Sequence, residues 1–178
     1  MKITNFFLAI VMLTLLYSCS SNSDDNSTPN TSVENTWKFG DHTYKHNGQI
    51  SQQSNYTVSE NKPFSITQAT TVTPSNNGLF SGVTFHFNTH EAGTYTVKSQ
   101  NTVIENIDSK YIYIEVINGN LQNQAAGYGS IDGNTTVTVQ KVDGKFIITA
   151  TDPIVMDEIM NTGLNAPTST TFTCNKVK

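Results

Sequence analysis

From residue 36 onward the chain consists of short runs in which apolar and polar residues alternate, separated by Gly, Asn and Asp. A period of two is typical of strands that bury one face and expose the other to solvent. In LFSGVTFHFN (79–88), for example, Val83, Phe85 and Phe87 alternate with Thr84 and His86. Strands do not alternate with long helical segments, so the pattern predicts an all-β fold. We expect an antiparallel β-sandwich, jelly-roll-like, immunoglobulin-like or barrel-like, of about eight to ten strands.

The clearest local prediction is a hairpin in TTVTVQKVDGKFIITA, residues 135–150. Two alternating runs meet at Asp143-Gly144, and Asp-Gly is a preferred sequence for a type I′ turn between strands.

The segment DPIVMDEIMNTG, residues 152–163, fits two different elements. Asp152 could cap a helix, Pro153 suits its first position, and Gly163 would end it. These signals favour one short helix near 153–161. The alternative is a strand that continues from the preceding run past a break at the proline.

The first 18 residues have the features of an export signal. Lys2 is their only charged residue, and a mostly apolar run from Phe6 to Leu16 is too short to span a bilayer. Residues 16–19, Leu-Tyr-Ser-Cys, resemble a bacterial lipobox. This resemblance implies that residues 1–18 are a signal peptide and that Cys19 becomes the lipidated first residue. Several acyl chains on that cysteine would anchor the protein firmly to a membrane.

Residues 19–35 are polar and offer little to bury, so we expect a lipidated, disordered tether. Its sixteen residues after Cys19 would span roughly 20–24 Å as a flexible coil. Asp24 and Asp25 resemble the acidic export signal of surface lipoproteins in the Bacteroidetes group. That resemblance implies an outer-membrane protein that faces the cell exterior.

The remaining chain, residues 36–178, suits a single domain. The formal net charge is −4, and the ten basic residues are all lysines. The absence of a basic patch argues against a nucleic-acid partner. The absence of arginine also disfavours an enzyme for anionic substrates, because Arg is the usual planar clamp for carboxylates and phosphates.

Cys174 is the only cysteine left once Cys19 is lipidated, so no disulfide is expected. It shares one face of a predicted strand with Phe172, which indicates a buried thiol that packs like a small apolar side chain. A reactive thiol would need a nearby His or cation that the sequence does not place.

No catalytic, metal or cofactor motif is found in the sequence: HExxH, GxSxG, Walker and EF-hand patterns are all absent. The pairs His42/His46 and His86/His90 are each four residues apart, which on a strand separates them by about 13 Å. We therefore expect polar surface histidines, no metal site, no catalytic residue and no cofactor.

Residues 127–133, GYGSIDG, nearly match GxGxxG, but Asp132 replaces the third glycine and no helix signal follows. We expect a loop that leads into the strand at Thr135.

The run YIYIEV offers a candidate ligand-binding face. If Ile112, Ile114 and Val116 point into the core, three side chains share the opposite face of the strand: Tyr111, Tyr113 and Glu115. Two tyrosines beside a carboxylate suit stacking on a sugar ring and hydrogen bonding to its hydroxyls. The alternative is that a second layer, or the 99–110 segment, covers this face too.

Three stretches support a family resemblance: EAGTYTV (91–97), GYGSIDGNTTVTVQKVDGKFIITA (127–150) and FTCN (172–175). They resemble the small β-rich lipoproteins of Bacteroidetes-type bacteria. The resemblance implies a β-rich fold and an envelope location, and it implies no particular activity.

Together these observations predict an outer-membrane, surface-exposed lipoprotein without enzymatic activity. Its partners would be the membrane, through the lipid anchor, and a glycan, polymer or envelope protein, which it would bind as a module. The first alternative is a structural or assembly subunit that pairs through an edge strand. The second is a hydrolase, which would require converging carboxylates in a deep cleft.

Overall fold

The computed structural model describes residues 34–46, 51–57, 63–75, 79–87 and 91–178. The domain belongs to one compact unit, Ser32–Lys178. The predicted signal peptide, Cys19, Asp24 and Asp25 lie outside the described residues. Within the described ranges, no helix is both long and apolar enough to span a bilayer.

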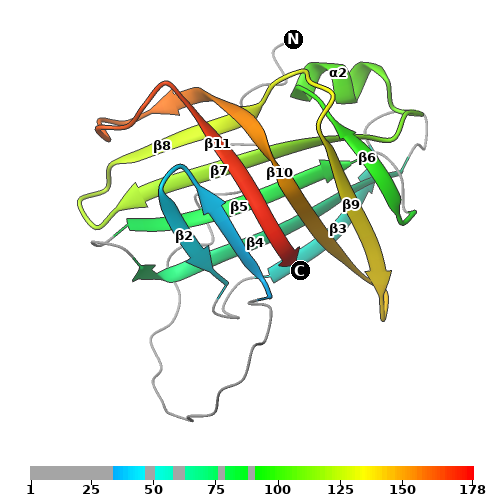
Figure 1. Ribbon diagram of the computed structural model, residues 1–178, viewed down its shortest axis with the longest axis horizontal. Coiled ribbons are helices and arrows are strands. Elements are labelled where there is room, and N and C mark those ends of the chain that lie inside the picture. The colour runs from blue at the N-terminus through cyan, green and yellow to red at the C-terminus, as the bar shows by residue number, and fades with distance from the viewer. Residues whose placement is uncertain (1–33, 47–50, 58–62, 76–78, 88–90) are drawn as a thin grey trace. The chain divides into compact units, whose positions relative to one another are not determined.

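Eleven strands and one short helix occur in the described part of the chain (Figure 1). In chain order they are β1 (Thr36–Phe39), β2 (His42–Lys45), β3 (Ser51–Thr57), β4 (Pro63–Ser75), β5 (Leu79–Phe87), β6 (Gly93–Val97), α2 (Gln100–Glu105), β7 (Tyr111–Asn120), β8 (Ala125–Ser130), β9 (Thr136–Val142), β10 (Lys145–Asn161) and β11 (Ser169–Val177).

All eleven described strands belong to one sheet, in the order β2-β1-β11-β10-β9-β6-β7-β5-β4-β3, with β8 paired to both β7 and β10. The all-β prediction is confirmed. Every described pair is antiparallel except β6 with β7, which is parallel. A parallel pair needs a crossover connection, and α2 lies within the segment that supplies it.

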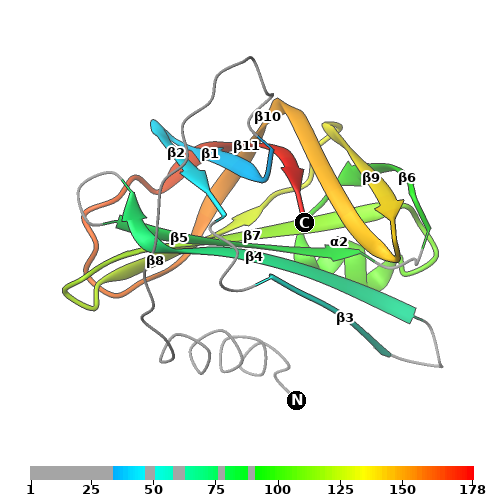
Figure 2. The same cartoon turned by 90° about the horizontal axis from the view of Figure 1, so that it is seen from below.

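The sheet folds into two layers that face each other. Figure 2 shows β1, β2, β11 and β10 on one side and β3, β4, β5 and β7 on the other, and in Figure 1 the strands of the two layers cross obliquely. Two routes join β7 to β10: one through β8, the other through β6 and β9. The inner faces of both layers are thereby enclosed as a common core.

The core is built from the alternate positions that the sequence pattern predicts. Phe85 and Phe87 of β5 are fully buried and make edge-on ring contacts with Phe172 and Phe146 of the other layer, at centroid distances of 6.1 and 5.0 Å. These aromatic contacts add to the burial of apolar surface, which is the main stabilising contribution to the fold.

A buried hydrogen bond also crosses the core. Trp37 of β1 donates from Nε1 to Ser81 Oγ of β5, at 2.9 Å. The bond satisfies two polar groups away from water and links β1 to β5.

The predicted hairpin is confirmed. β9 and β10 pair antiparallel with Val142 opposite Lys145, and the two residues between them, Asp143 and Gly144, have φ values of 51° and 79°. Positive φ at both central positions is the requirement of a type I′ turn.

The helix predicted near 153–161 is wrong, because this segment is the second half of β10. Ile154 and Met156 are buried while Val155 and Ile159 are exposed, which is the alternation of a strand. The segment pairs with β11 on one edge and with β8 on the other, and these ladders outweigh the local helix-capping signals. Pro153 lies at a shift in the β10–β11 register, where a missing N–H is tolerated.

The loop predicted for 127–133 is also wrong in part, because residues 125–130 form β8. Large side chains lie over two of its glycines. A Cβ on Gly127 would be 2.7 Å from Met160 Cγ, and one on Gly129 would be 2.5 Å from the Tyr113 hydroxyl oxygen. The glycines therefore allow neighbouring side chains to approach the strand closely and do not indicate a turn.

Candidate functional site

The predicted ligand face of β7 is not an open platform. Ile112, Ile114 and Val116 are buried in the core, as predicted. On the opposite face, however, Tyr113 is only 4% exposed and its ring lies against Gly129 of β8. Burial, and secondarily the Glu115 carboxylate, raises the pKa of Tyr113 well above its ordinary value. Tyr113 cannot stack on a sugar from solvent.

The side chains around Tyr113 explain its burial. The His86 ring lies 5.5 Å from the Tyr113 ring, and His86 Nε2 is 3.8 Å from a Glu115 carboxylate oxygen. On the other side Tyr111 is half-buried, with the Lys98 ammonium 5.5 Å from its ring centroid. α2 also lies close to β7.

The expectation of surface histidines is wrong for His86 and His46, which are both buried. Among the described residues, no group of three or more His, Cys, Asp or Glu side chains is placed to hold a metal ion.

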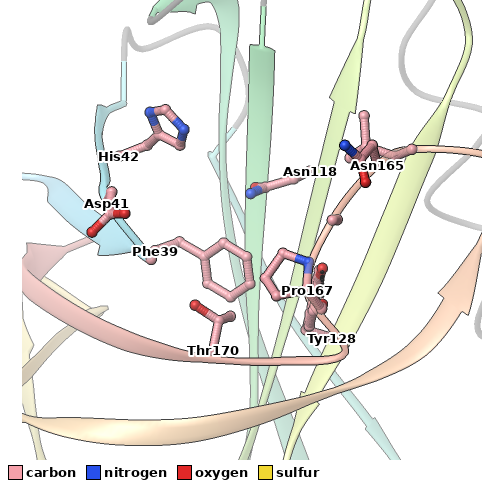
Figure 3. Close-up of a pocket in the computed structure, with 11 residues that line it drawn as sticks. Phe39, Asp41, His42, Asn118, Tyr128, Asn165, Pro167 and Thr170 are labelled. Atoms are coloured by element: carbon pink, nitrogen blue, oxygen red, sulfur yellow. Dashed lines mark hydrogen bonds between the residues drawn. The ribbon is translucent and has the colours of Figure 1, made fainter.

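A different part of the molecule contains a pocket. A cavity of about 240 Å³ lies between the β1–β2 turn, the ends of β7 and β8, and the connection from β10 to β11 (Figure 3). Its described lining is Phe39, Gly40, Asp41, His42, Asn118, Tyr128, Leu164, Asn165, Ala166, Pro167 and Thr170. The walls thus combine aromatic and aliphatic surface with a few polar groups, which is the usual composition of a ligand site.

The β1–β2 turn carries Asp41 and His42 to the rim of this pocket. Gly40 has a φ of +58°, which favours glycine, and its N–H donates to Thr171 O of β11 at 2.9 Å. A Cβ on Gly40 would be 3.1 Å from Thr170 Oγ1. The glycine therefore lets the turn lie close against β11.

Two aromatic rings form the inner wall. Phe39 of β1 and Tyr128 of β8 meet edge-on with centroids 4.8 Å apart. The Tyr128 hydroxyl donates to Pro167 O at 2.8 Å and so ties the β10–β11 connection to the wall.

The β10–β11 connection is held by further hydrogen bonds. Asn161 Oδ1 accepts from the N–H groups of Gly163 and Leu164 at 2.8 and 2.9 Å, and Thr162 Oγ1 accepts from Ala125 N at 2.8 Å. This side of the pocket is thus ordered before any ligand arrives, which lowers the entropic cost of binding.

Asn118 is the most informative residue in the pocket. It lies on the core side of β7, is 8% exposed, and Figure 3 shows its amide directed across the pocket towards the side that carries Phe39 and His42. Its Oδ1 accepts no hydrogen bond. A buried acceptor without a partner costs about 1–3 kcal/mol, so a water or a ligand donor is expected to fill this position.

Sequence reasoning missed this pocket, although one signal was present. The alternation that places Ile112, Ile114 and Val116 in the core also places Asn118 there, and an amide on a core face needs a partner. Asp41 and His42 carried no comparable signal, because their relation to Asn118 depends on how the two layers meet.

The described lining of the pocket offers hydrogen-bonding groups and apolar surface. Asp41 is the only carboxylate among the described lining residues, whereas a glycoside hydrolase of the usual kind needs two. Cys174 lies elsewhere and is buried as predicted, and burial raises the pKa of its thiol to about 12. Such a thiol is not a nucleophile at neutral pH.

Comparison with protein-family models, with curated proteins and with solved structures found no significant match to this chain.

Proposed function

We propose that this protein is a lipid-anchored outer-membrane lipoprotein that faces the cell exterior and binds a glycan in the pocket beside Asn118, without catalysing a reaction. The observation that carries the proposal is the unpaired Oδ1 of the buried Asn118, whose side-chain amide extends into a pocket with an ordered rim. A site with a vacant acceptor favours a ligand rich in hydrogen-bond donors.

A sugar ring fits the chemistry of the walls. Its hydroxyls can donate to Asn118 Oδ1 and to the Asp41 carboxylate, while its C–H surface can pack on Leu164 and Pro167. The volume of about 240 Å³ is below the roughly 300–1,000 Å³ of sites for drug-sized ligands. The pocket is therefore suited to one ring of a larger glycan.

The first described residues lie apart from the pocket. Glu34, the first described residue, forms an ion pair with Lys176 at 2.7 Å, and β1 starts at Thr36. The pocket begins at the other end of this strand, at Phe39, about 10 Å from Thr36 for three residue steps along a strand. In a protein anchored through its N-terminus, the pocket would thus lie away from the attachment point.

The binding proposal is tested by titrating the protein calorimetrically with neutral oligosaccharides. Asn118→Leu keeps a similar side-chain size but removes the acceptor, so we expect affinity to fall about 10- to 100-fold, because a ligand donor is left unpaired. Thermal stability should not fall, since a polar group without a protein partner is removed. Asn134→Leu, at an exposed position outside the pocket lining, is the matched control. Unchanged affinity in Asn118→Leu would refute the proposal.

The location is tested separately, on intact cells treated with an added protease. If Asp24 and Asp25 direct export to the surface, replacing both with Ala should protect the protein from cleavage and leave it lipidated. Equal cleavage of wild type and variant would show that the two acids have no export role and belong to an ordinary linker. Protection of both would exclude the surface location.

The alternative of assembly through an edge strand has one supporting observation. β2 and β3 are the outermost strands in the described sheet order, and β3 contains neither a charged residue nor a proline. Charges and prolines are common protections of an exposed edge. If β3 pairs with another chain, light scattering should show an oligomer that Asn55→Pro converts to a monomer.

A further inference from the structure

The charge of the pocket is set by one residue. Asp41 is the only carboxylate among the described lining residues, and no lysine is among them. The chain has no arginine. Within the described ranges, the ion pairs that involve lysine are Lys110 with Glu91 and Lys176 with Glu34, and neither includes Asp41. Among the described lining residues, which include His42 but no lysine, Asp41 therefore supplies the only carboxylate charge.

The Asp41 charge should strengthen the binding of neutral ligands and weaken the binding of anionic ones. An ionised carboxylate accepts two or more hydrogen bonds from neutral hydroxyls, and such charge-assisted bonds are stronger than neutral ones. A ligand carboxylate or sulfate close to Asp41 would instead be repelled. For two like charges about 4 Å apart in water the repulsion corresponds to about a fivefold loss of affinity, and to more where water is excluded.

We infer that the pocket takes an uncharged sugar ring and discriminates against acidic sugars, with Asp41 as the residue that determines this specificity. The inference rests on the proposed function and names the class of glycan that the same site would bind. Specificity by repulsion is effective where the site cannot rearrange to avoid the unfavourable contact. Here Gly40 N–H holds the turn that carries Asp41 against Thr171 O, and Tyr128 holds the opposite rim through Pro167.

The experiment compares matched pairs of trisaccharides that differ only by oxidation of C6 to a carboxylate. The neutral probes are trisaccharides of glucose, galactose and mannose, and the acidic probes are the corresponding triuronic acids. Each is titrated into wild type, Asp41→Asn and Asp143→Asn at low salt. Asp41→Asn keeps an acceptor and removes the charge. Asp143→Asn removes the same charge from the β9–β10 turn, where the positive φ of 51° is one that Asn tolerates.

For the sugar that binds, wild type should prefer the neutral form at least fivefold. Asp41→Asn should lose most of this preference by gaining affinity for the acidic form, and Asp143→Asn should behave as wild type. An acidic form that binds wild type equally well, or an unchanged preference in Asp41→Asn, overturns the inference while leaving the binding proposal intact. If neither form of any sugar binds, the proposed function fails, and the inference with it.

Discussion

Replacing Gly129 with alanine tests the way in which β7 and β8 are packed. A Cβ at this position would lie 2.5 Å from the Tyr113 hydroxyl oxygen and 3.1 and 3.2 Å from two ring carbons. The ring has little room to move, because Tyr113 is 4% exposed and the His86 ring is 5.5 Å away on its other side. Overpacking of this kind costs about 1–3 kcal/mol. For a domain of this size the melting temperature should fall by roughly 3–12 °C.

The source of the loss can be assigned with a double-mutant cycle. Tyr113→Phe removes the atom that would be closest to the new methyl group, so Gly129→Ala should be better tolerated in that background. We expect a coupling free energy of about 1 kcal/mol or more, which is within the range for residues in contact. Gly133→Ala is the control, since its nearest contact would be at 4.0 Å.

Chemical and thermal denaturation of the four proteins in the cycle, followed by circular dichroism, gives the required free energies. If Gly129→Ala is as stable as Gly133→Ala, or if its cost is the same with Tyr and Phe at position 113, the tyrosine ring does not lie over this glycine. The predicted open ligand face of β7 would then have to be reconsidered.

Three further predictions follow from other parts of the chain. Burial raises the pKa of Cys174 from 9 to about 12, so between these pH values the folded state keeps a proton that the unfolded state releases. The free energy of unfolding should therefore fall as the pH rises from 9 to 12. In urea titrations over this range, Cys174→Val should show a smaller dependence of the unfolding free energy on pH. At pH 8 the native thiol should not react with a thiol reagent until the protein unfolds. Tyr128→Phe frees Pro167 O, so it should cost about 0.5–1.5 kcal/mol and weaken ligand binding several-fold, with faster hydrogen exchange in the β10–β11 connection. Cys19→Ala should abolish acyl labelling and membrane fractionation; persistent labelling would contradict the lipobox assignment.

The sequence alone determined those features that depend on neighbours along the chain. Alternation in β5, β7 and β9 predicted which side chains enter the core, because a pleated strand sends successive side chains to opposite faces whatever its partners are. Asp143-Gly144 predicted its turn, because few residues tolerate positive φ at two successive positions. Burial of Cys174 followed from the same alternation.

Only the tertiary structure decided the features that depend on pairing between distant segments. Residues 153–161 have helix-capping signals, yet β8 and β11 supply hydrogen-bond ladders on both edges and make them a strand. Tyr113 is covered because Gly129 brings β8 close to its ring. The pocket joins Asp41 and Asn118, which no spacing in the sequence relates. Local patterns specify which face of a strand is apolar, whereas strand order and layer packing decide which of those faces meet, and therefore where a buried amide is left facing a cavity.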